Sequence, residues 1–171
     1  SSQIVGFICT IILARMLFPS DFGLIGMTVI ITALAQALVD SGFSQALIRK
    51  QNCTEIEYNT VFYSNILIGF FLYLFIFLIS PFIASFFDRP ELVIIIRVIS
   101  IVIPINSFSL IQKTILTKDL NFKSQSYVTL LGVSIAFTSA VLLANAGYGV
   151  WSLVFRGLIQ QLVIAFMLWK F

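Results

Sequence analysis

The chain has 171 residues, of which 60% are hydrophobic and only 10% are charged, with a net charge of +3 and a mean hydropathy of +1.07. A soluble domain carries about 25% charged residues, and one of this size buries only about 70% of its surface, so a soluble fold is excluded. Because a membrane-spanning helix needs roughly 20 apolar residues, the composition predicts an all-α, polytopic transmembrane helix bundle of about six spans.

Absent and isolated residue types exclude several kinds of site. The sequence has no histidine, which excludes histidine acid–base catalysis, histidine-activated nucleophiles and histidine metal ligands. Its two cysteines, Cys9 and Cys53, form neither a disulfide framework nor a paired metal motif, and no glycine-rich nucleotide motif is present. We therefore expect no catalytic residues, no metal, no cofactor and no enzyme activity. The basic residues suit membrane topology and not nucleic-acid binding.

Apolar segments separated by polar turns define six expected spans. They cover residues 1–17, 22–48, 56–87, 90–116, 126–144 and 150–170. Thr54 and Glu57 have the spacing of a capping box that opens the third span, and Pro81 is expected to kink or end it. Trp151 and Trp169 bracket the sixth span at a separation of about 27 Å, close to the hydrocarbon thickness. Because the first span is short and the last stops at the chain end, we expect a fragment of a longer protein that forms one transmembrane lobe.

Basic residues are distributed unequally between the two ends of the expected spans. One end carries Arg49, Lys50, Lys113, Lys118, Lys123 and Lys170, and the other carries Arg15 and Arg89. Since Lys and Arg are enriched in cytoplasmic loops, the first end is predicted to face the cytoplasm.

Polar residues recur on one face of the second span. Thr28, Thr32, Gln36 and Asp40 follow each other at intervals of four residues, which places them within an arc of roughly 120°. This pattern fits hydrogen bonding between helices, worth only about 0.6 kcal/mol per pair, or the wall of a water-filled cavity. A carboxylate at depth costs a few kcal/mol, so Asp40 is a candidate for ion coupling, unless it only reaches the cytoplasmic interface.

Three arginines lie in or beside apolar spans. Arg97 lies about 10 Å into the fourth span, Arg156 lies five residues after Trp151, and Arg15 lies at the outer end of the first span. Each side chain could extend to the outer headgroups. Alternatively, the three face the interior and line a cavity that suits an anionic head group. Together with Gln36, these arginines are the candidate substrate-binding residues.

Four blocks of sequence resemble one known family. Residues 14–27 (ARMLFPSDFGLIGM) are similar to the first outer loop and second helix of polysaccharide flippases, and residues 40–50 (DSGFSQALIRK) to the exit of that helix. Residues 116–123 (LTKDLNFK) resemble the fourth cytoplasmic connection, and residues 147–154 (GYGVWSLV) the start of the sixth helix. The blocks occur in the family's order over essentially the whole chain. It therefore resembles the Wzx-like polysaccharide or O-antigen flippases, in the lipopolysaccharide or colanic-acid exporter branch of the multidrug/oligosaccharidyl-lipid/polysaccharide superfamily.

The resemblance implies a fold of two six-helix lobes that opens alternately to each side of the membrane, with this chain as the first lobe. Family members hold a lipid diphosphate with cationic side chains in a central cavity. Arg15 fits that description by position and Arg97 fits it less closely, whereas Arg156 matches no family pattern. The implied activity is translocation of polyprenyl-diphosphate-linked oligosaccharide repeat units across the bacterial cytoplasmic (inner) membrane, for synthesis of lipopolysaccharide or exopolysaccharide.

The implied partners are the lipid-linked oligosaccharide, membrane lipids, and the polysaccharide polymerase and chain-length machinery. Two alternatives stay open. A cation-coupled multidrug exporter of the same superfamily would need acidic residues deep in the lobe, but every span except the second lacks a mid-span carboxylate. A membrane enzyme of glycan-lipid synthesis would need a cluster of Asp, Glu or His at one membrane face, and the acidic residues here are scattered.

Overall fold

The computed structural model describes residues 2–40, 43–50 and 53–170, and this part of the chain folds into eight helices without a strand. The helices are α1 (Ser2–Met16), α2 (Pro19–Val39), α3 (Phe43–Arg49), α4 (Glu55–Phe86), α5 (Leu92–Ile99), α6 (Val102–Lys118), α7 (Phe122–Asn145) and α8 (Val150–Lys170). The all-α fold class that the composition predicts is confirmed.

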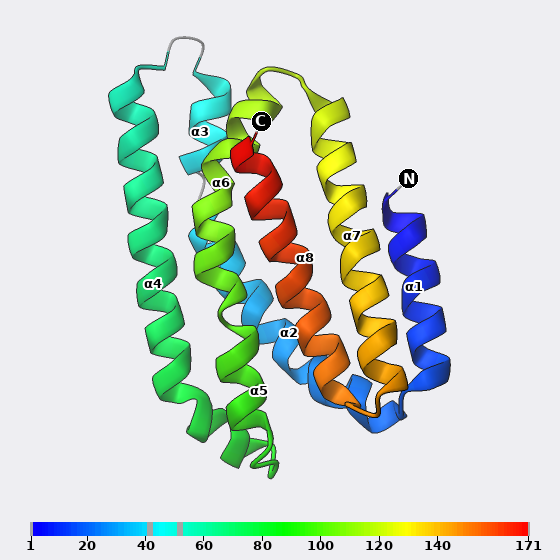
Figure 1. The fold of residues 1–171 in the computed structure, drawn as a ribbon. Helices are drawn as coiled ribbons and strands as arrows, with labels where there is room; N and C mark the ends of the chain where they lie inside the picture. The colour runs from blue at the N-terminus through cyan, green and yellow to red at the C-terminus, as the bar shows by residue number, and fades with distance from the viewer. Residues whose placement is uncertain (1, 41–42, 51–52, 171) are drawn as a thin grey trace.

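Figure 1 shows the long helices side by side in a bundle. α8 packs between α6 and α7, α4 lies against α5 and α6, and α1 packs along α7. α2 crosses behind this row and contacts α4, α5, α6 and α8. The ends of α3, α6 and α8 and the starts of α4 and α7 lie together at one end of the bundle (Figure 1). We call it the lysine-rich end, after Lys50, Lys118, Lys123 and Lys170.

Five segments of the described chain are long and apolar enough to cross a membrane. They are Pro19–Val39, Glu55–Phe86, Leu92–Lys118, Phe122–Asn145 and Val150–Lys170. α1 has 15 residues, fewer than the roughly 20 of a full span, and packs along α7. The predicted bundle of about six spans therefore consists of five long spans and one shorter helix.

The predicted second span, 22–48, is divided in the structure. α2 begins earlier, at Pro19, and ends at Val39, and α3 follows from Phe43 to Arg49. The break falls at Asp40, whose N–H caps α2 by donating to the Gln36 carbonyl at 2.9 Å, and residues 41–42 lie outside the described part. Asp40 is a weak helix former, which favours the end of α2 at this residue.

The predicted fourth span, 90–116, contains a second break. Pro104 has no N–H to donate to the Ser100 carbonyl, which accepts from the Ile103 N–H at 2.9 Å instead. This tighter bond lies at the junction where α5 ends at Ile99 and α6 begins at Val102. The two helices still form one continuous membrane-spanning segment.

The predicted capping box at the start of α4 is confirmed. The Thr54 N–H donates to the Glu57 carboxylate at 3.1 Å. The same carboxylate accepts a hydrogen bond from Lys50, and this ion pair raises the pKa of the Lys50 ammonium, which lies outside the spans. The contact ties the end of α3 to the first turn of α4.

Pro81 lies inside α4 and does not end it. A proline there leaves the Phe77 carbonyl without its usual N–H partner. The Ser80 hydroxyl donates to that carbonyl at 2.8 Å, and the helix continues to Phe86. Because no water is present in the bilayer core, such a replacement partner is what lets the helix persist.

Gly132, Ala136 and Ala140 are spaced four residues apart in α7, which predicts a helix-packing seam. All three are buried, and a Cβ on Gly132 would lie 2.7 Å from the Ile164 Cγ1 of α8. Ala140 packs with Leu13 of α1. The seam is confirmed, and it joins α7 to the helices on both of its sides.

Leu120 closes α6 with a backbone φ of 54°, a left-handed conformation that leucine rarely adopts. The Leu120 N–H donates to the Thr117 carbonyl at 3.1 Å and the Asn121 N–H to the Leu116 carbonyl at 2.9 Å, a helix ending that usually has glycine at the left-handed position. Leu120 is 73% exposed, so its side chain contributes little by burial.

We expect Leu120→Gly to raise the free energy of unfolding by roughly 0.5–1 kcal/mol. The left-handed conformation costs a non-glycine residue about 1–2 kcal/mol, and the greater freedom of glycine in the unfolded chain offsets part of that gain. Thermal unfolding in detergent measures the change. Leu142→Gly, at an exposed position inside α7, is the control and should destabilise the protein.

Candidate functional site

Arg97 has the best-defined surroundings of the candidate residues. It lies in α5 and faces α4, where its Nε donates to the Ser80 Oγ at 3.0 Å and its guanidinium carbon lies 4.2 Å from the centre of the Phe77 ring. The side chain is only partly buried. Its two terminal nitrogens bond to no other residue of the described chain. The structure therefore orients the guanidinium while leaving most of its donors available to an acceptor.

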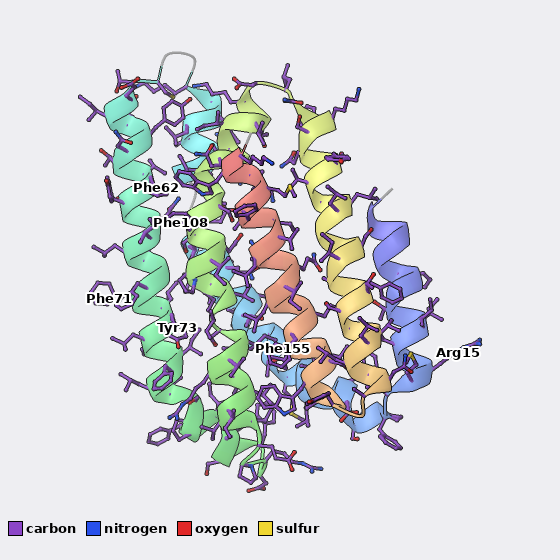
Figure 2. The ribbon with its side chains drawn as sticks, in the orientation of Figure 1. Arg15, Phe62, Phe71, Tyr73, Phe108 and Phe155 are labelled. Carbon is purple, nitrogen blue, oxygen red and sulfur yellow. The ribbon has the colours of Figure 1, made fainter. Side chains whose placement is uncertain are left out.

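Arg15 and Arg156 lie in different surroundings from Arg97 and from each other. Arg15 is in the last turn of α1 and is exposed, and Figure 2 shows its side chain extending away from the bundle. Arg156 lies in the second turn of α8 and is partly buried. Arg89 lies in the turn between α4 and α5. Together with Arg15 and Arg156, it belongs to the end of the bundle opposite to the lysine-rich end, where the basic residues of the described chain are arginines.

Gln36 and Asp40 lie in the last turns of α2. Gln36 is partly buried, whereas Asp40 is exposed at the C-terminal cap of the helix. The two threonines on the same face bond to their own helix: the Thr28 hydroxyl donates to the Ile25 carbonyl at 2.8 Å, and the Thr32 hydroxyl to the Thr28 carbonyl at 3.1 Å. These threonines therefore form no hydrogen bond to a neighbouring helix within the described structure.

The helices that carry the candidates are neighbours, but the five side chains do not form one cluster. α2, α5 and α8 pack together through a buried apolar group that contains Ile95, Val154 and Leu158. Arg97 contacts α4, while Arg15 and Asp40 are exposed at opposite ends of the bundle. Among the residues that the structure places, no group of three or more His, Cys, Asp and Glu side chains could hold a metal ion.

A polar pocket that the sequence reasoning missed lies between α6, α7 and α8. Its volume is about 130 Å³, and its lining extends toward the lysine-rich end as far as Lys113 of α6 and Gln125 of α7. The polar side chains that line it are Asn106, Ser109 and Lys113 of α6, Gln125 and Thr129 of α7, and Gln161 of α8. The Gln161 Nε2 donates to the Asn106 Oδ1 at 2.8 Å, which joins α8 to α6. The signal in the sequence was the presence of these two amides inside apolar spans.

These features define a class of protein: a multi-pass helical membrane protein with arginine and amide side chains inside its spans. The chain belongs to the polysaccharide biosynthesis protein family, whose pattern matches residues 12–171. The family resemblance seen in the four sequence blocks is thereby confirmed. Together with its five apolar helices, this makes it a multi-pass protein of the bacterial cytoplasmic membrane.

Curated relatives align with most of this chain. The succinoglycan biosynthesis transport protein ExoT of Rhizobium meliloti is 27% identical over 92% of the chain and 32% of its own length. The lipopolysaccharide biosynthesis protein WzxC of Escherichia coli is 24% identical over 93% of the chain and 32% of its own length. The teichuronic acid biosynthesis protein TuaB of Bacillus subtilis is 33% identical over 62% of the chain and 22% of its own length. This chain spans about a third or less of the length of these relatives, and no solved structure matches it.

Proposed function

We propose that this protein translocates polyprenyl-diphosphate-linked oligosaccharides from the cytoplasmic to the outer leaflet of the membrane, for the synthesis of surface polysaccharide. The observation that carries the proposal is the similarity over nine-tenths of the chain to proteins named for succinoglycan transport and lipopolysaccharide biosynthesis. The helix bundle, with polar side chains at membrane depth, supports the same function.

The physical chemistry of the cargo explains why such a protein is needed. Each sugar hydroxyl that is stripped of water without a new partner costs roughly 2–7 kcal/mol, so a glycan cannot cross hydrocarbon unaided. A cavity that opens to one side at a time removes this barrier without breaking a bond, so the proposed activity is transport and not enzymatic catalysis. An inside-negative potential favours outward movement of a diphosphate by about 2.3 kcal/mol per charge per 100 mV.

In this proposal the chain forms one lobe of a two-lobe transporter, and the arginines hold the diphosphate. Arg97 is the strongest member of the set, because Ser80 and Phe77 orient its guanidinium. Arg15, Arg156 and Gln36 complete the set of substrate-binding residues, and Asp40 couples transport to an ion. The polymerase and chain-length machinery would receive the cargo at the outer leaflet.

Native mass spectrometry of the protein purified from its own membranes tests the proposal. A retained mass that fragments into a polyprenyl diphosphate and sugars is the expected result, and it also identifies the glycan. Retention of ordinary phospholipid alone, together with binding of a cationic drug that shifts with Na⁺ or pH, would replace the proposal with a cation-coupled multidrug exporter.

A further inference from the structure

The polar pocket between α6, α7 and α8 has a cation and no carboxylate in its lining. Lys113 is the charged residue of this lining, and no Asp or Glu side chain lines the pocket. The Lys113 ammonium forms no salt bridge with any residue that the structure describes. A second cation would therefore be repelled from this pocket, whereas an anion would find an unneutralised positive charge.

Residues that carry hydrogen-bond donors line the same pocket. Within the described part of the chain, the amide nitrogens of Asn106 and Gln125 and the Lys113 ammonium donate no hydrogen bond to the protein. The two hydroxyls are different, since Ser109 and Thr129 donate to carbonyls of their own helices at 3.1 and 2.8 Å. The available groups that can donate are thus an ammonium and two amides, a set that suits phosphoryl oxygens.

Size limits the ligand to a small group. The pocket volume of about 130 Å³ equals that of roughly four water molecules, and sites for drug-sized ligands begin at about 300 Å³. A single phosphoryl group fits this volume, and a glycan repeat unit does not.

Depth places the pocket within reach of phospholipid headgroups. Lys113 lies five residues before the end of α6, which is about 8 Å along the helix axis. The headgroup layer of a bilayer adds about 5–8 Å on each side of the hydrocarbon core, so Lys113 lies near the boundary between the two.

Charge, donors, size and depth all agree, and we propose that this pocket binds a phosphoryl group at the cytoplasmic side of the bundle. The proposal does not depend on the transport function above.

The phosphoryl group can come from a phospholipid or from dissolved phosphate, and one experiment distinguishes them. The purified protein is placed in phosphatidylcholine nanodiscs with a minor fraction of phosphatidylglycerol, and retained lipid is counted by native mass spectrometry with and without inorganic phosphate. A lipid site retains phosphatidylglycerol in preference to phosphatidylcholine, and dissolved phosphate does not displace it. A phosphate site instead retains phosphate in pure phosphatidylcholine discs.

Lys113→Gln is expected to weaken the binding of the retained ligand roughly tenfold or more, because it removes a charge-assisted hydrogen bond. Lys123→Gln is the matched control, since Lys123 is exposed at the same end of the bundle and does not line the pocket. Gln125→Met removes an open amide without changing the charge, and it serves if Lys113→Gln proves unstable. The proposal would be overturned if Lys123→Gln lost as much bound ligand as Lys113→Gln, or if Lys113→Gln and Gln125→Met both retained ligand like the wild type. It would also be overturned if the wild type neither retained phosphatidylglycerol in preference to phosphatidylcholine nor retained inorganic phosphate.

Discussion

Replacing Gly69 by leucine is expected to lower the free energy of unfolding by about 1–3 kcal/mol or more, a large effect for one residue. Gly69 is buried in α4, and a Cβ there would lie 2.8 Å from the Ser107 Cβ and 3.7 Å from the Ile103 carbonyl oxygen of α6. Both neighbours belong to or adjoin a helix backbone, so α4 and α6 would have to separate. Lipid tails are as apolar as leucine, so close packing is a main force that holds such helices together.

Gly26→Leu is the matched control for this prediction. Gly26 lies inside α2, and a Cβ there would meet no atom within 4 Å. Both substitutions gain about 0.8–1 kcal/mol in helix propensity, so the difference between the two variants isolates the contact with α6. Denaturant titration in mixed micelles measures both. If the two variants unfold at the same denaturant concentration, α4 and α6 do not approach each other as the structure has them.

The helices could be predicted from the sequence because each long span is an apolar run between polar turns. Two interruptions could not be placed by hydropathy alone. Apolar residues continue from α2 into α3, and the end of α2 depends on the backbone preference of Asp40. The junction of α5 and α6 depends on which N–H replaces the one that Pro104 lacks, and that is a matter of local geometry.

The candidate site divides in the same way. The depth of Arg97 could be predicted from its position in the sequence. Its proposed role in binding a diphosphate could be predicted from the chemistry of the guanidinium group. Arg97 contacts Ser80 because the two residues lie on either side of the turn between α4 and α5, at about the same distance from it. They therefore lie at the same depth in the bundle. The polar pocket could not be predicted, because its members come from three helices and meet only when α8 packs between α6 and α7.

Export of surface polysaccharide is expected to fall by roughly 10- to 100-fold when Arg97 is replaced by glutamine. A hydrogen bond to a charged group contributes about 1.5–3 kcal/mol, and the guanidinium would make at least one such bond to the diphosphate. Export is measured by quantifying surface glycan in cells that lack the chromosomal copy, and the amount of each variant in the membrane fraction is measured in parallel.

The structure offers two further variants that separate charge from orientation. Arg97→Lys keeps the charge but lacks the Nε–H that bonds to Ser80, so it should retain partial export. Arg89→Gln removes a charge from the exposed turn at the same end of the bundle, and it should export like the wild type. If Arg97→Gln and Arg15→Ala both exported normally while present at wild-type levels in the membrane, the arginines would be interfacial anchors. The diphosphate would then have to be held by other groups.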